Sequence, residues 1–161
     1  MTIFIEHLFI FLQITIICLF LSQSGFLFKK LIFLEHDNRN LEENGLLGFI
    51  FIGFISLIIN FFYPLSLVVN NILFFIIFVI SFLFNFFDQN KIKLIKKIFC
   101  VSFFCYVIFI YSNVNTPDAL LYHLPYSRII NEDKIIIGLS SIHFRFGHIS
   151  IFQYISSFFN N

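Results

Sequence analysis

The sequence predicts an all-α membrane protein with about four transmembrane helices, an outward loop with short interfacial helices, and the start of a fifth helix. The first observation is composition, because 59% of the 161 residues are hydrophobic and only 12% are charged. Mean hydropathy is +0.93, which separates the chain from ordinary soluble domains. The second observation is that several apolar runs approach or exceed the ~20 residues that a helix needs to cross a bilayer. The net charge of +1 gives no reason to expect nucleic-acid binding.

Four apolar runs predict spans at about residues 7–28, 45–62, 67–87 and 94–111, which together form a transmembrane region over residues 1–112. The first run lacks a basic start and a small-residue cleavage site, so we interpret it as a retained helix and not as a signal peptide. Tyr63 and Pro64 predict a turn between the second and third spans, because proline suits a helix boundary.

A further apolar run begins near the C-terminal end of the sequence. Residues 149–161 are about half as long as a membrane-crossing helix needs to be. They predict either a terminal interfacial helix or the start of a fifth span. We favour the second interpretation, in which the sequence is a piece of a longer multi-span protein.

The basic residues predict how the chain is oriented. Four alternating spans would place two basic loops on one side, and these loops hold Lys29, Lys30, Arg39, Lys91, Lys93, Lys96 and Lys97. Only Arg128, Lys134 and Arg145 fall on the other side. Cytoplasmic loops carry an excess of lysine and arginine, so the two basic loops are predicted to be cytoplasmic. The expected location is the inner (cytoplasmic) membrane, multi-pass, with the N-terminus and the loop 113–148 facing outward.

Polar and small residues inside the predicted spans have structural and functional interpretations. Asparagines could line a pathway, but hydrogen bonds between helices are their commoner use, and we favour that role for Asn60, Asn70, Asn71 and Asn85. Glycines on the second span are expected to let a neighbouring helix approach closely, and these are Gly45, Gly48 and Gly53.

Candidate metal and redox residues are sparse. Three cysteines fall within predicted spans without C-x-x-C spacing, so we interpret them as small buried hydrophobic side chains: Cys18, Cys100 and Cys105. Glu35, His36 and Asp37 could form a metal-binding triad, but a solvated linker is the favoured interpretation in a loop with basic neighbours. No cofactor is evident from the sequence, and a divalent metal stays an open alternative.

Polar residues gather in the predicted outward loop. Thr116-Pro117 predicts a helix start, with the threonine as N-cap. Asp118 and Tyr122 are then four positions apart and share one face of the helix. Pro125 is expected to break or kink this helix, with a second short turn beyond it. Such an amphipathic helix would lie on the outer membrane surface, where a partly desolvated acid is suited to proton transfer.

The second half of the loop supplies groups that can bind an anion. Arg145 can form a bidentate pair with two phosphate oxygens, such as a lipid-linked sugar donor would present. His143 lies two positions before it, so the two side chains share a face only on an extended segment. Structural roles are the alternatives: Asp118 as a charge stabilised by the helix dipole, and Arg145 as an interfacial anchor or the partner of Glu132 or Asp133.

This region follows the pattern D-x-x-x-Y-H and then G-L-x-x-x-H-x-R-F-G-x-x-S. The matching positions that we take from it are Asp118, Tyr122, His123, Gly138, Leu139, His143, Arg145, Gly147 and Ser150. The pattern resembles that of a family of bacterial polytopic membrane proteins grouped with the C-type membrane glycosyltransferase superfamily. Residues 45–66, with a glycine-rich start and a Pro-Leu-Ser ending, are similar to the second-span region of that family. The chain looks like the family's N-terminal part.

The resemblance implies an enzyme that uses a polyprenyl-phosphate-linked sugar on the outer face, in cell-envelope glycan assembly. Asp118 would act as the base on the acceptor hydroxyl or help to bind a metal, and the implied substrate-binding residues are Tyr122, His123, His143 and Arg145. The implied partners are membrane lipids and the polyprenyl-phosphate sugar donor. The chain departs from the superfamily pattern, which commonly has eight or more spans. It also carries Ala119 beside Asp118, where better-known relatives have a paired acidic motif.

Two other classes compete with this interpretation. A non-catalytic integral membrane protein could use the same loop to bind a lipid headgroup or a partner, or the chain could be a truncated remnant. A small-solute transporter fits less well, because the predicted spans show no broken helices and carry no charged residues except Lys96 and Lys97, whose side chains can reach back to the membrane surface.

Overall fold

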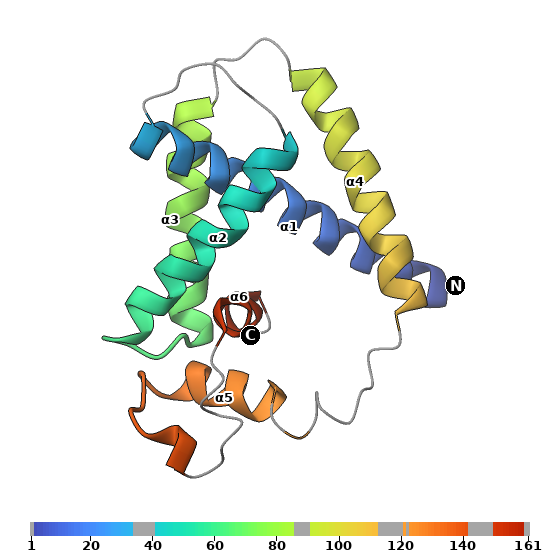
Figure 1. Cartoon of the computed structure of the whole chain (residues 1–161). Coiled ribbons are helices and arrows are strands. Elements are labelled where there is room, and N and C mark those ends of the chain that lie inside the picture. The colour runs from blue at the N-terminus through green and yellow to red at the C-terminus, as the bar shows by residue number, and fades with distance from the viewer. Residues whose placement is uncertain are drawn as a thin grey trace. The chain divides into compact units, whose positions relative to one another are not determined.

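The regular structure of this chain is helical. The computed structural model describes residues 2–33, 41–85, 91–112, 121, 123–141 and 150–159. Within these residues it contains α-helices and one short 3-10 turn but no strand, which confirms the all-helical prediction (Figure 1). The elements are α1 (Thr2–Phe33), α2 (Leu41–Asn60), α3 (Leu67–Asn85), α4 (Lys91–Tyr111), α5 (Leu124–Glu132), η2 (Leu139–Ser141) and α6 (Ile151–Phe159).

Two helices are long and apolar enough to cross a membrane. The stretch Ile5–Ile32 in α1 has 28 residues and reaches a mean hydropathy of 2.0, and α2 has 20 residues and reaches 1.7. α3 carries a shorter apolar stretch, Leu67–Ser81. The described residues therefore give two candidate spans, and the total of four transmembrane helices stays a prediction.

The ends of α2 show which signals set a helix boundary. α2 begins at Leu41 and not at residue 45, and its first turn contains Glu42 and Glu43. Carboxylates there interact favourably with the positive end of the helix dipole, so they extend the helix although they lower its hydropathy. At the other end, the N–H of Tyr63 donates to the carbonyl of Ile59 at 2.8 Å as the helix turns into the loop. The turn predicted at Pro64 is confirmed.

The chain contains two compact units. Unit 1 consists of Met1–Phe49 and Phe78–Ser112, and unit 2 consists of Ile50–Ile77 and Asn113–Asn161. In unit 1, α1 packs against α4 through aromatic rings. The ring of Phe11 lies 5.3 Å from that of Phe99 and 5.6 Å from that of Tyr106, both edge to face. Such pairs add a directional attraction to the burial of apolar area, which favours one relative position of the two helices.

α1 and α2 cross closely in unit 1, and each helix carries a glycine at the crossing. A Cβ atom added to Gly25 would overlap the carbonyl oxygen of Asn44, and one added to Gly48 would overlap that of Leu21. Backbones can come this close only where small residues meet. The packing role predicted for Gly48 is confirmed, and Gly25 is a second packing residue that the sequence analysis did not select.

The two other glycines of α2 differ from each other. A Cβ added to Gly53 would lie 2.5 Å from Cγ1 of Ile151 in α6, which confirms its predicted packing role. The same prediction is wrong for Gly45, because no atom of the described residues lies within 4 Å of the position that its Cβ would occupy. Gly45 instead lines a cavity in unit 1.

Unit 2 is built around a cluster of buried side chains from the α2–α3 turn, α5, η2 and α6. These are Leu65, Tyr126, Ile130, Leu139 and Tyr154. α5 packs against α6 (Figure 1). The other face of α5 carries the exposed side chains of Arg128 and Glu132. α5 is therefore amphipathic, with its apolar face turned to the core of the unit.

Pro125 lies at the start of α5, so the second turn predicted beyond it is confirmed, and the predicted break or kink before it stays a prediction. Pro125 stands in the first turn of α5, which continues to Glu132. Proline is tolerated at that place because the first N–H groups of a helix have no acceptor within the helix. The helix predicted to start at Thr116 lies outside the described residues.

Candidate functional site at the α2–α3 turn

One buried asparagine bonds the region around α5 to the α2–α3 turn. Asn60 is the last residue of α2 and is only 1% exposed. Its Nδ2 donates to the carbonyl of Ile130 at 3.1 Å and to that of Asp133 at 3.0 Å. Both acceptors lie at the C-terminal end of α5, where helix carbonyls have no intrahelical donor. The carboxamide therefore caps α5 from a different helix.

Two backbone hydrogen bonds run beside this contact. The N–H of Leu65 donates to the carbonyl of Ile130 at 3.0 Å, and the N–H of Ile135 donates to the carbonyl of Asn60 at 2.9 Å. The second bond pairs a carbonyl at the end of α2 that would otherwise lack a donor. The chain from Ile130 to Ile135 is thus fixed along the turn, with its backbone groups paired as burial requires.

Asn70 makes a second connection from the first turns of α3. Its Nδ2 donates to the carbonyl of Leu65 at 3.0 Å and to that of Ser157 in α6 at 3.1 Å. The hydroxyl of Ser157 in turn donates to the carbonyl of Ser127 in α5 at 3.4 Å. The α2–α3 turn, α5 and α6 are therefore joined by a continuous set of hydrogen bonds.

These bonds decide the interpretation of the span asparagines. The structural role is confirmed for Asn60 and Asn70, because each uses its amide to hold two backbone segments together. Asn71 is exposed. The side chain of Asn85 lies outside the described residues.

Two buried tyrosines meet in the same unit. Tyr126 is 2% exposed and Tyr154 is 1% exposed. Burial, and then the neighbouring Tyr154 hydroxyl, raise the pKa of Tyr126 above its ordinary value. The Tyr154 oxygen nevertheless has no hydrogen-bond partner of normal geometry within the described residues. We interpret the pair as a weak contact between protonated phenols, because burial disfavours the phenolate.

A small cavity lies beside these contacts. It measures about 10 Å³, and Asn60, Tyr126 and Asp133 are among the residues that line it. A single water needs about 10–15 Å³ by the same measure, so this space admits one water at most. It is too small for a sugar. The surrounding residues therefore hold α5 against the α2–α3 turn and do not form a substrate cavity.

The exposed face of α5 carries an ion pair. Nε of Arg128 lies 2.7 Å from Oε1 of Glu132, one turn further along the helix. This hydrogen bond, and then the charge of Glu132, raise the pKa of Arg128. Exposed pairs of this kind contribute little stability. The bond does occupy Glu132, which the sequence analysis gave as a partner for Arg145.

Four of the five predicted site residues lie outside the described residues: Asp118, Tyr122, His143 and Arg145. His123 is described. It lies directly before α5, is exposed, and makes no side-chain capping bond to the helix. Its role in substrate binding stays a prediction.

Metal and thiol residues add no further site within the described ranges. No three His, Cys, Asp or Glu side chains come together there in a way that could hold a metal ion. Glu35, His36 and Asp37 lie outside those ranges. All three cysteines are free thiols, and Cys18 and Cys105 are half-buried. The predicted burial is wrong for Cys100, which is exposed because it faces outward from α4 with no described residue covering it.

The chain was also compared with known protein families. A family model described as a domain of unknown function, DUF8201, matches residues 8–161. The chain belongs to this family. The matched region includes all five predicted site residues. No curated protein and no solved structure matches the chain significantly.

In this DUF8201 domain, α6 begins with a capping arrangement that the sequence analysis did not identify. The N–H of Phe152 donates to Oγ of Ser150 at 3.2 Å, and the N–H of Ser150 donates to Oε1 of Gln153 at 3.1 Å. The signal that could have found it is a serine three residues before a glutamine, at the start of an apolar run. Ser150 belongs to the pattern that carried the family resemblance, and the contact observed for it is structural.

Proposed function

We propose that this DUF8201 domain is the N-terminal, membrane-embedded part of a glycosyltransferase-like protein in the cytoplasmic membrane. Its outward segment, residues 113–148, would receive a polyprenyl-phosphate-linked sugar and pass the sugar to an acceptor in cell-envelope glycan assembly. The observation that carries the proposal is the anchoring of α5 to the turn between two apolar helices. That anchoring would hold the polar side chains of the segment at a membrane surface, where a lipid-linked phosphate is found.

Contacts at the start of α2 support the proposed topology. Nζ of Lys29 lies 3.0 Å from Oε1 of Glu43, and Nζ of Lys97 lies 4.0 Å from Oε1 of Glu42. The end of α1, the start of α2 and the start of α4 therefore lie together. This is the arrangement expected if the two basic loops share one side of the membrane, and their positive charge favours the cytoplasmic side.

Contacts at the end of α2 support the opposite side for the polar segment. α2 has 20 residues, so its ends are about 30 Å apart, which equals the usual thickness of the hydrocarbon core. The far end, at Asn60, bonds to Ile130 and Asp133. If α2 crosses the membrane, its two ends lie on opposite sides, and α5 is on the side of Asn60, which we propose to be the outer side.

The proposed reaction is a direct group transfer. The acceptor oxygen forms a bond to the anomeric carbon of the sugar while the bond from that carbon to the phosphate oxygen breaks. Asp118 takes the proton of the acceptor hydroxyl, and polyprenyl phosphate leaves with the electron pair of the broken bond. Arg145 and His143 stabilise the phosphate, because a guanidinium can bind two of its oxygens at once. Tyr122 and His123 bind the substrate beside Asp118.

Sugar transfer by the protein expressed from its complete reading frame tests this proposal. Membranes receive polyprenyl-phosphate carrying a radiolabelled sugar, and label transferred to glycan is measured. Asp118→Asn should abolish transfer without reducing membrane insertion, because an amide cannot take the proton. Asp133→Asn is the matched control, since Asp133 is an exposed acid of the same segment whose contact with Asn60 is made by its backbone carbonyl. Normal transfer by Asp118→Asn membranes would remove Asp118 from the mechanism.

Binding of the donor's lipid phosphate gives an independent test. Polyprenyl phosphate, added to nanodiscs that carry the chain, should bind less well to Arg145→Gln than to Arg128→Gln. The reason is that Arg128 is already paired with Glu132 on the exposed face of α5. Equal binding by the two variants would make a non-catalytic membrane protein the better interpretation.

A further inference from the structure

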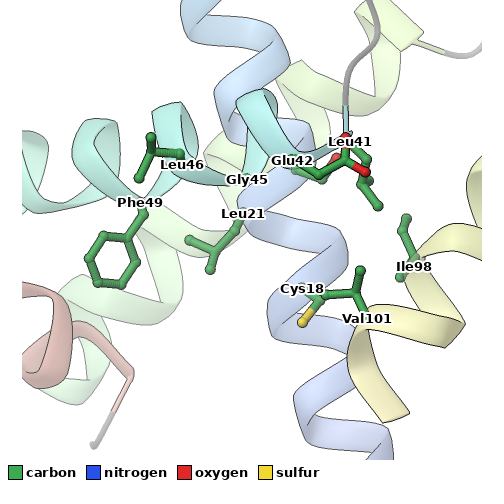
Figure 2. A pocket seen from close by; sticks show the side chains of 10 residues that line it. Cys18, Leu21, Leu41, Glu42, Gly45, Leu46, Phe49, Ile98 and Val101 are labelled. Atoms are coloured by element: carbon green, nitrogen blue, oxygen red, sulfur yellow. The ribbon is translucent and has the colours of Figure 1, made fainter. Parts of the chain in front are cut away.

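Unit 1 contains a cavity of about 440 Å³ bounded by side chains of α1, α2 and α4 (Figure 2). Its walls are almost wholly apolar. α1 contributes Leu21, α2 contributes Leu46 and Phe49, and α4 contributes Ile98 and Val101. Binding sites for small molecules measure roughly 300–1,000 Å³ and are lined mainly by such side chains. The cavity therefore has the size and the chemistry of a site for an apolar group.

Gly45 keeps this cavity open on the α2 side. It lines the cavity, and within the described part of the chain no atom lies within 4 Å of the position that its Cβ would occupy. Gly48 differs, because the backbone of α1 fills the corresponding space. Alanine favours a helix over glycine, and the packing of unit 1 leaves room for it at position 45. An occupant that needs this space gives a reason for the glycine.

Two opposite charges stand at one edge of the cavity. Glu42 lines the cavity, and its Oε1 lies 4.0 Å from Nζ of Lys97. The side chains are 72% and 57% exposed, respectively, so the pair is loose and each group can bind a further ion. The edge thus offers one anionic and one cationic partner beside an apolar interior.

The size of the cavity favours one class of apolar occupant over another. An α-helix with its side chains is about 10–12 Å across, so 440 Å³ would hold only roughly one turn of it. A crossing helix of this or another chain needs ~20 residues and would extend far beyond the cavity. A single hydrocarbon chain is thin enough to enter between the three helices and to contact all of their walls.

We infer that the cavity binds one acyl chain of a phosphatidylethanolamine molecule, whose ammonium group binds Glu42 and whose phosphate binds Lys97. A zwitterionic headgroup pairs with both charges, whereas phosphatidylglycerol offers no cation to Glu42. The inference requires that α1 and α2 lie in a membrane, but it does not require sugar transfer. Each proposal can therefore fail while the other holds.

Photolabelling of the complete chain in phosphatidylcholine nanodiscs tests this inference. The probe is phosphatidylethanolamine with a photoreactive group in one acyl chain, and labelled peptides are located by mass spectrometry. We expect label on the cavity residues, and above all on peptides that contain Leu21, Phe49 and Val101. Unlabelled phosphatidylethanolamine should compete with the probe, and phosphatidylglycerol should compete less.

Variants that fill the cavity supply the controls. Gly45→Phe and Val101→Phe each place a ring in the cavity from a different helix, and both should lose the labelling. Val68→Phe adds the same ring to an exposed position of α3 outside the cavity and should keep it. Glu42→Gln should remove the preference for phosphatidylethanolamine over phosphatidylglycerol, because the anionic partner is gone. If one of the two variants that fill the cavity fails to fold, the other variant and the competition between lipids still test the inference.

Three results would overturn the inference. The first is labelling of Gly45→Phe and Val101→Phe at the level of the unmodified chain. The second is competition by phosphatidylglycerol as strong as that by phosphatidylethanolamine. The third is cross-linking between two copies of the chain through the cavity residues, which would assign the cavity to a second copy.

Discussion

At the scale of single residues, the side chain of Asn60 donates to the carbonyls of Ile130 and Asp133 from a buried position at the end of α2. Asn60→Ala would leave the Asp133 carbonyl without this donor, whereas the Ile130 carbonyl keeps the N–H of Leu65. A buried polar group that loses its partner costs about 1–3 kcal/mol. We expect Asn60→Ala to lower the free energy of unfolding by an amount of that order, measured by thermal unfolding in detergent.

Asn71 provides the matched control for this prediction. It is the same residue type on the neighbouring helix, but its side chain is exposed. Asn71→Ala should change the stability by no more than about 0.5 kcal/mol, as is usual for surface substitutions. Amide hydrogen exchange gives a second readout, because the N–H of Ile135 should exchange faster in Asn60→Ala. Two variants of equal stability and exchange would contradict the anchoring role.

The residue scale also shows what the sequence can predict about polar groups. Asn60 and Asn70 could be selected as hydrogen-bonding residues, because a polar side chain in an apolar helix needs a partner. Their acceptors could not be selected. These are backbone carbonyls of Ile130, Asp133 and Ser157, and every residue of the chain carries such a carbonyl. Only the folded arrangement brings particular ones within reach.

At the scale of helices, two glycines of α2 should respond in opposite ways to one substitution. A Cβ at position 48 would overlap the carbonyl of Leu21, whereas a Cβ at position 45 would have no described residue within 4 Å. Overpacking a close contact costs about 1–3 kcal/mol, and alanine is about 1 kcal/mol better than glycine within a helix. Gly48→Ala should therefore lower the Tm in detergent, and Gly45→Ala should keep or raise it. Equal Tm values would mean that α1 and α2 do not cross at Gly48.

Helix positions could be predicted from the sequence more closely than helix ends. An apolar run of about 20 residues marks a helix because its backbone groups must be paired inside the segment. The ends depend on local effects that hydropathy does not measure. Glu42 and Glu43 extend α2 through the helix dipole. Pro125 fits both after a helix and in its first turn, and hydropathy does not show that it stands in the first turn of α5.

At the scale of the whole molecule, the candidate site could be predicted by residue type and by family resemblance but not by geometry. Four of its five residues lie outside the described ranges, and His123 is the one that can be placed. What the structure adds is the set of hydrogen bonds from Asn60 that holds α5 at the end of α2. These bonds join distant parts of the chain, and hydropathy and charge counts carry no information about such contacts.

The two ends of α2 lead to a prediction about the topology of the molecule. Ile137 follows α5 and is 95% exposed, and the Lys97 side chain at the start of α4 is 57% exposed. In a chain whose native cysteines are replaced by alanine, Ile137→Cys should react with a membrane-impermeant maleimide in sealed, right-side-out membrane vesicles. Lys97→Cys should react only after the vesicles are opened, because the lysine-rich side is expected to be cytoplasmic.

A second position on each side separates topology from local accessibility. Ser140 and Lys96 are both exposed, so Ser140→Cys should behave like Ile137→Cys, and Lys96→Cys like Lys97→Cys. Opened vesicles serve as the reference in which all four cysteines must react. The reverse pattern would orient the chain the other way and place the polar segment in the cytoplasm. Equal labelling of both pairs in sealed vesicles would mean that α2 does not separate two sides of a membrane. The proposal of an outward-facing sugar-transfer site would then be rejected as well.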